Sequence, residues 1–280
     1  MTAEEWLGRL TTELHRRGVA PDAVVAEAAH HLRESGQAPE RVFGPPAAYA
    51  AAVAESLLGP GVESPGWVRP AAVGGEPGVE PPGAVRLEAR GITKRYAHRT
   101  VLDGVDLTVR AGEVVAVVGA NGCGKSTLLR ICAGLTSPDA GAVHVRGRLG
   151  YCPQEGGTVE RLTPDEHFVL IGAGRGTDRA TARRQGRTAA AVLDWPGVDR
   201  SPVAGKLSGG TRQKLNLIMS GLGDPDVLLL DEPYQGFDKG SYLDFWQQVW
   251  RWRTERKAVV VVTHLLSELN RVDNVLELGR

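Results

Sequence analysis

One stretch of the chain, GANGCGKST at residues 119–127, constrains the fold more than any other. It follows the apolar run VVAVV and precedes LLRICAG, so the chain leaves a buried strand, turns at glycines and enters a helix. A helix that begins in this way has backbone N–H groups without partners at its N-terminus, where its dipole also favours negative charge. We therefore predict an anion-binding loop between the strand and the helix.

The spacing within this stretch indicates that the anion is a polyphosphate. Gly119, Gly124, Lys125 and Ser126 fit the pattern G-x-x-x-x-G-K-[ST]. The glycines let the backbone curl around phosphates without side-chain clashes, and the lysine is placed to reach the β and γ phosphates. The serine hydroxyl is placed for Mg²⁺. A plain glycine turn would need neither the lysine nor the hydroxyl in register.

Two later apolar runs, DVLLLDEP and AVVVVVTH, end in polar residues. Continuous apolar runs are typical of parallel strands covered on both faces, whose active sites lie at the carboxyl ends. Asp231 and Glu232 follow the first run. One carboxylate can hold Mg²⁺ through water while the next polarises the attacking water, as phosphoryl transfer requires.

A second candidate anion cradle lies in LSGGTRQKLNLIMSG, residues 207–221, where a serine cap and two glycines open a helix. One nucleotide does not need two cradles. With this signature, the motifs in their order resemble the ATP-binding subunits of ABC proteins, in which the signature closes on nucleotide held by the opposite subunit. The resemblance covers roughly residues 85–280, about seventy percent of the chain.

The resemblance implies an α/β fold with a P-loop NTPase core of the ABC type, an antiparallel β subdomain and a helical subdomain. It also implies the site residues. Lys125, Glu232 and His264 form the catalytic set, in which Glu232 orients water and His264 contacts the γ-phosphate. The nucleotide-binding set is Tyr96, which stacks on adenine, with Gly119, Asn121, Gly122, Gly124, Lys125, Ser126, Thr127, Gln154, Ser208, Gly209, Gly210 and Asp238. The metal-binding set is Ser126, Gln154 and Asp231.

Two positions depart from the pattern of the family. Thr211 stands where the signature usually has glutamine, and Phe237 stands where leucine is usual before the aspartate of the D-loop, Asp238. Neither change removes a group that hydrolysis needs. They put the geometry of the dimer and the turnover rate in doubt.

The chain before the cassette has a different composition. Residues 1–59 carry helical patterns, beginning with a capping box of Thr2 and Glu5, and residues 60–83 contain 6 Pro and 6 Gly. We therefore expect a small all-α domain over 1–59, a linker over 60–83 and the ATP-binding domain over 84–280, with its helical subdomain at about 155–220. The helical part resembles the HAAS type, and an unrelated four-helix regulatory appendage fits equally well.

Bulk properties exclude some function classes. The net charge is −5 over residues 1–83 and +5 over the remainder, which is too small an excess to indicate nucleic-acid binding. Three cysteines argue against a disulfide framework, and the sequence has no apolar run long enough to span a membrane. We expect a cytoplasmic protein, peripheral on the cytoplasmic face of the membrane.

The resemblance implies a subunit that binds and hydrolyses ATP with Mg²⁺. Two such subunits, as a homodimer or a heterodimer, would close on ATP and drive separately encoded transmembrane domains. VERLTPDEHFVLIGAGRG is similar to the segment after the Q-loop in small exporters, which favours export. The alternatives are a soluble ABC ATPase acting on ribosomes or DNA, and an ATP-dependent regulatory protein.

Overall fold

The computed structural model describes residues 1–19, 21–35, 38–57, 83–97, 99–263 and 272–279. The chain divides into two compact units. The helical unit comprises Met1–Glu63, Glu155–Gly223 and Tyr234–Asp244, and the sheet unit comprises Ser64–Gln154, Asp224–Pro233 and Phe245–Arg280. The predicted linker, apart from Gly83, and the predicted switch histidine, His264, lie outside the described residues.

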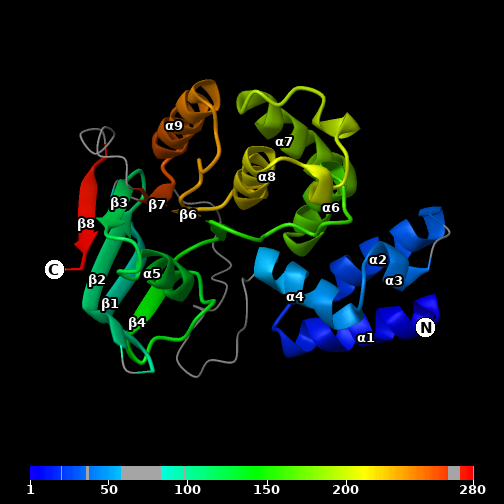
Figure 1. Cartoon of the computed structure of the whole chain (residues 1–280), viewed down its shortest axis with the longest axis horizontal. Helices are drawn as coiled ribbons and strands as arrows, with labels where there is room; N and C mark the ends of the chain where they lie inside the picture. The colour runs from blue at the N-terminus through cyan, green and yellow to red at the C-terminus, as the bar shows by residue number, and fades with distance from the viewer. Residues whose placement is uncertain (20, 36–37, 58–82, 98, 264–271, 280) are drawn as a thin grey trace. The chain divides into compact units, whose positions relative to one another are not determined.

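The sheet unit contains a five-stranded parallel sheet (Figure 1). Its strands are β3 (Val114–Gly119), β5 (Leu149–Cys152), β6 (Val227–Asp231), β7 (Ala258–Val262) and β8 (Asn274–Leu278), in the spatial order β5-β6-β7-β3-β8. Every residue of β6 and β7 is buried, as the continuous apolar runs predicted. Because the strands are parallel, their carboxyl ends lie along one edge of the sheet.

A second sheet of the same unit is antiparallel and has the order β2-β1-β4. It is built from β1 (Val85–Tyr96), β2 (Arg99–Arg110) and β4 (Ala140–Val145). Helix α5 (Lys125–Cys132) contacts both sheets, and its Leu128 and Leu129 are fully buried in the core that they share. The predicted α/β fold with an antiparallel subdomain is thus confirmed.

The helical unit contains three helices of the region predicted as a helical subdomain: α6 (Pro164–Gly174), α7 (Arg179–Val192) and α8 (Gly209–Gly221). Short 3-10 helices at Val198–Arg200 and Ala204–Lys206 lead into α8, and α9 (Lys239–Thr254) begins in this unit. Helices α6 and α7 approach closely, since a Cβ on Gly186 would lie 2.2 Å from the ring of Phe168. Among the described residues, no helix is long and apolar enough to cross a membrane.

Four N-terminal helices complete the helical unit: α1 (Ala3–Arg16), α2 (Pro21–Ser35), α3 (Pro39–Val42) and α4 (Pro46–Leu57). The predicted capping box of Thr2 and Glu5 opens α1. An aromatic cluster joins three of these segments, because Trp6 stacks on Phe43 with ring centroids 5.2 Å apart and lies 5.5 Å from Tyr49. The indole N–H of Trp6 donates to the carbonyl of Gly44 at 2.9 Å, so the buried ring has no unpaired donor.

The N-terminal helices share their hydrophobic core with the start of the helical subdomain. Leu162 and Leu170 belong to the same buried cluster as residues of α1, α2 and α4. Figure 1 shows α2 and α4 beside α6. The shared core packs the first helices against residues more than a hundred positions later in the chain. The domain boundaries stay a prediction.

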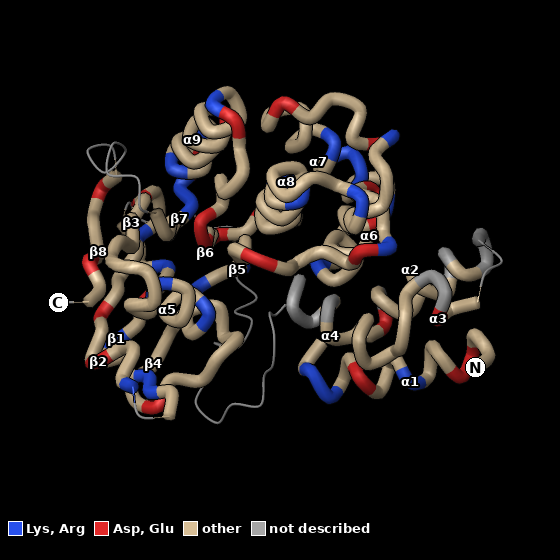
Figure 2. The backbone as a smooth tube through the Cα atoms, viewed as in Figure 1, with Lys and Arg blue, Asp and Glu red and all other residues tan. Residues whose placement is uncertain are grey.

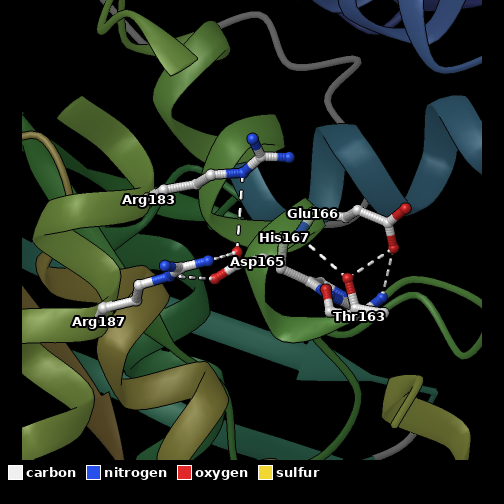
Figure 3. Close-up of polar contacts among 6 residues, drawn as sticks. All are labelled: Thr163, Asp165, Glu166, His167, Arg183 and Arg187. Carbon is white, nitrogen blue, oxygen red and sulfur yellow. Dashed lines mark hydrogen bonds and ion pairs between the residues drawn. The ribbon is translucent and has the colours of Figure 1, made fainter. Parts of the chain in front are cut away.

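Polar contacts secure the beginning of α6 (Figure 3). Thr163 and Glu166 form a capping box, and the Asp165 carboxylate lies between the guanidinium groups of Arg183 and Arg187 on α7. His167 is 1% exposed, and its Nε2 accepts from the Val159 backbone N–H at 2.9 Å. Its Nδ1 lies 2.8 Å from the Thr163 carbonyl oxygen, so these partners require a neutral ring protonated at Nδ1.

Burial lowers the pKa of His167 to about 4, although the Thr163 carbonyl and the Glu166 charge oppose this shift. The unfolded chain, with an ordinary histidine pKa near 6.5, binds more protons than the folded chain between these values. The stabilisation by neutral His167 is therefore complete above about pH 6.5 and is lost as the pH falls toward 4. Between these two pH values the free energy of unfolding falls by about 3 kcal/mol because of this residue.

We predict that denaturant titrations from pH 7 to pH 4 give a smaller loss of unfolding free energy for His167→Gln than for the wild type, because the amide keeps both hydrogen bonds and does not titrate. His144→Gln, at an exposed position of β4, is the control and should keep the wild-type slope. An unchanged slope in His167→Gln would contradict the assignment.

Candidate nucleotide site

Glycines with positive φ shape the loop between β3 and α5. Gly119 has φ 145°, Gly122 has 76° and Gly124 has 108°. A Cβ on Gly119 would lie 2.4 Å from the carbonyl oxygen of Leu278, and one on Gly124 would lie 2.8 Å from that of Val101. Larger residues would clash with fixed backbone at both positions, so these two glycines are required by the packing of the loop as well as by its φ angles.

Lys125 is folded back over the loop and is only 5% exposed. Its ammonium donates to the carbonyl oxygens of Gly119 at 2.8 Å and Ala120 at 3.0 Å. Gly124 is the N-cap of α5 and provides no side-chain cap. The helix N-terminus and the ammonium thus both provide positive charge at the loop, which is the electrostatic requirement of a phosphate site.

Asp231 ends β6 beside the start of α5 and is 2% exposed. Figure 2 shows the end of β6 in the red of acidic residues. Burial raises the pKa of Asp231 to about 6, with a smaller contribution from Glu232, whereas a hydrogen bond from Ser126 and the charge of Lys125 lower it. Its Oδ1 is buried and has no hydrogen-bond partner within the described part of the chain. A hydroxyl and a carboxylate with an unused oxygen are hard oxygen donors, which fit Mg²⁺.

Glu232 follows directly and is 8% exposed. Its φ of 45° is in the left-handed region, a conformation that a residue with a side chain rarely adopts outside constrained sites. The amide of Gln154, which follows β5, donates to Oε2 of Glu232 at 3.3 Å. The structure therefore brings together two predicted site residues that are 78 positions apart in the sequence.

The start of β2 also reaches the phosphate loop. Its first residue, Arg99, donates to the carbonyl of Gly122 at 3.1 Å, a contact that no motif in the sequence predicted. The ring of Tyr96 is 49% exposed, with the Lys94 ammonium 5.5 Å from its centroid. An exposed ring at a strand end is available for stacking on a base. Asn121 is exposed, and the nearby Thr127 is half-buried.

The signature residues belong to the helical unit. Ser208 caps α8, accepting from the Thr211 N–H at 3.2 Å, and the hydroxyls of the two residues lie 2.7 Å apart. Thr211, the first of the two residues that depart from the family pattern, thus takes part in the cap of α8. A Cβ on Gly210 would lie 2.3 Å from the Gly236 carbonyl oxygen, whereas one on Gly209 would meet nothing within 4 Å.

Asp238 is exposed at the start of α9 and accepts from the backbone N–H of Ser241 at 2.9 Å and from its hydroxyl at 3.2 Å. The backbone hydrogen bond from Ser241 is the main cause of a lowered pKa of Asp238. Phe237, the second departure, has the Lys214 ammonium 5.8 Å from its ring centroid. This contact links α8 to the segment before α9.

The predicted residues therefore fall into two groups, apart from His264, which lies outside the described residues. The sheet unit holds the phosphate loop, Tyr96, Gln154, Asp231 and Glu232. The helical unit holds the signature Ser208–Gly210 and Asp238. Their roles stay predictions, and the sheet-unit group has the charges and donors of a site for a nucleotide with Mg²⁺.

Comparisons with known proteins identify the family. The family profile described as ABC transporter matches residues 102–235. Nod factor export ATP-binding protein I of Burkholderia lata is 31% identical over 211 residues, which cover 69% of this chain and 68% of that protein. Aliphatic sulfonates import ATP-binding protein SsuB of Burkholderia ambifaria is 39% identical over 192 residues, covering 64% of this chain and 56% of that protein. The chain belongs to the ABC transporter ATP-binding family.

Solved structures agree on the fold. A structure titled as the ATP binding subunit of an ABC transporter has a TM-score of 0.63 and 26% identity, covering 69% of this chain and 86% of its own. A bacterial ABC transporter cassette solved as a dimer has a TM-score of 0.62 and 22% identity, covering 69% of this chain and 97% of its own. The ATP-binding cassettes of this family are ATPases. The resemblance seen in the motifs is confirmed at the level of the family.

The two signature glycines provide a matched pair of variants. We predict that Gly210→Ala lowers the free energy of unfolding by about 1–3 kcal/mol, because its Cβ would displace the backbone at Gly236. Gly209→Ala, one residue earlier in the same helix turn, should change it by no more than about 0.5 kcal/mol. Denaturant titration of both variants measures the difference, and equal stabilities would contradict the close packing of Gly210.

Proposed function

We propose that the chain is the ATP-binding and ATP-hydrolysing subunit of an ABC transporter. The convergence of the phosphate loop with Asp231 and Glu232 at one edge of the parallel sheet carries this proposal. In it, Lys125 exchanges its contacts with loop carbonyls for contacts with the β and γ phosphates. The amides at the start of α5 bind the same phosphates.

Glu232 is the proposed general base. Its carboxylate follows a buried strand, so the rigid sheet holds it at the rim of the phosphate loop, where it orients the attacking water and accepts its proton. In the same proposal, His264 stabilises the negative charge on the transferred phosphoryl group, and Tyr96 stacks on the adenine. Because Glu232 is largely buried, its electrostatic interaction with the attacking water is stronger than it would be in bulk solvent.

Ser126 and Asp231 would hold Mg²⁺, with Gln154 as a further ligand. The ion would supply charge neutralisation on the phosphates. The unpaired buried oxygen of Asp231 supports this assignment, because a buried carboxylate oxygen without a partner is costly unless a ligand satisfies it.

The proposed active form is a dimer, either of identical chains or of a related pair. Ser208, Gly209 and Gly210 of one subunit would bind the nucleotide held by the other, with Asp238 nearby. The exposure of Ser208 and Gly209 at the N-terminus of α8 supports this, since an uncovered helix N-terminus can accept an anion from a second chain. Closure on ATP and opening after hydrolysis would be the mechanical output.

We propose transmembrane subunits as the partners and the cytoplasmic face of the membrane as the location. Export is the proposed direction, because the segment after Gln154 is similar to that of small exporters and the Nod factor export relatives align over the larger share of the chain. The names of the relatives include both directions. Copurification from detergent-solubilised membranes tests the partner, and recovery with ribosomes or DNA instead would contradict it.

The N-terminal helices are proposed as a regulatory domain of the HAAS type. The family profile matches residues 102–235, so these helices lie outside the part of the chain that it covers. Their shared core with α6 supports a role that involves the helical subdomain.

We predict that Glu232→Gln reduces ATP hydrolysis by about a hundredfold or more, because the amide cannot accept a proton from water. The variant should still bind ATP and favour the ATP-bound dimer, which size-exclusion chromatography with Mg²⁺ and ATP would detect. Glu255→Gln, at an exposed position, is the control and should hydrolyse ATP at the wild-type rate. Undiminished phosphate release by Glu232→Gln would count against the assignment.

A further inference from the structure

The segment that follows Gln154 is anchored inside the helical unit by buried side chains. The amide of Asn216, a 3% exposed residue of α8, donates to the Gly156 carbonyl at 2.9 Å. The Val159 N–H donates to Nε2 of the buried His167 at 2.9 Å. The signature helix and α6 therefore each hold one point of this segment.

Backbone hydrogen bonds anchor its next residues. The N–H of Gly205 donates to the Glu160 carbonyl, and the N–H of Ala204 donates to the Leu162 carbonyl, both at 2.8 Å. Four of the seven residues from Gly156 to Leu162 are thus anchored, so the segment is held as one piece within the helical unit.

The N-terminal helices cover this segment. Leu162 is 3% exposed and Leu170 of α6 is 2% exposed, and both are buried in the core of the N-terminal helices. Val159 packs against the same core. The guanidinium of Arg161 also reaches the Glu40 carbonyl at 3.4 Å. Without these helices, Leu162 at the end of the segment and Leu170 of α6 would lose their apolar cover.

Gln154 lies five residues before Val159 in the sequence and donates to Glu232. The amide of Gln154 occupies one oxygen of the carboxylate, at 3.3 Å. A water molecule must compete with the amide of Gln154 for the carboxylate. The contact therefore describes a resting arrangement of the proposed base.

We propose that the N-terminal helices are an autoinhibitory domain, which docks on the surface formed by Leu162 and Leu170 and holds the segment after Gln154 in its resting position. Docking keeps Gln154 on Glu232 and slows hydrolysis, and release of the helices frees the segment. The inference rests on the proposed function, since it requires Glu232 to act as the base.

Two pairs of leucines test it in the full chain. Leu162→Ala with Leu170→Ala weakens the docking surface, and the matched control is Leu222→Ala with Leu193→Ala. The control leucines are 3% and 2% exposed in the same unit but are not members of the N-terminal core. We expect the first pair to raise the rate of ATP hydrolysis at least about fivefold over the control pair. Equal or lower rates would overturn the proposal.

A reversible cross-link tests the opposite direction and does not require the core variants to fold. Glu40→Cys and Arg161→Cys introduce thiols on the two sides of the contact, in a Cys123→Ala background, because Cys123 is the one native cysteine that is not buried. A bis-maleimide with a cleavable disulfide would lock the helices in place.

We expect the cross-linked chain to hydrolyse ATP at least about fivefold more slowly than the same protein after cleavage of the linker. Equal rates before and after cleavage would overturn the autoinhibition alone. Absence of hydrolysis in every version, the wild type included, would overturn the proposed function and this inference with it.

Discussion

The parallel pairing of β3, β7, β6 and β5 is the constraint on which the candidate site depends. Hydrogen bonds between parallel strands align their directions, so the residues that follow each strand emerge at one edge. The phosphate loop follows β3, the carboxylates end β6, and Gln154 comes after β5. Groups that the chain separates by about a hundred residues thus meet because buried apolar strands leave a single sheet edge for polar side chains.

Charged side chains at this edge of the sheet are buried from solvent. Lys125 and Asp231 are both nearly inaccessible, and the raised pKa of Asp231 reflects the cost of burying a carboxylate. Lys125 offsets part of its own cost by donating to two loop carbonyls. Binding of a polyphosphate with Mg²⁺ would satisfy both residues, so the site is destabilised in isolation and complementary to a ligand of that chemistry.

Helix α6 connects two hydrophobic cores in the helical unit. One side packs against α7 through Gly186 and Phe168, and the other completes the core of the N-terminal helices through Leu170. A helix buried on both sides transmits a displacement, because neither core tolerates a void or an overlap. The polar contacts of Thr163 and His167 at its start add a requirement for a neutral imidazole.

The sequence by itself determined the phosphate loop, the carboxylates after β6, the cap of α8 and the α/β class, because these features depend on local spacing and on apolar periodicity. Only the tertiary structure decided which distant groups meet. The contact of Gln154 with Glu232, that of Arg99 with the loop, and the docking of the first helices on Leu162 and Leu170 join residues far apart in the chain. No local pattern encodes such contacts, since they follow from how complete elements bury their apolar faces against one another.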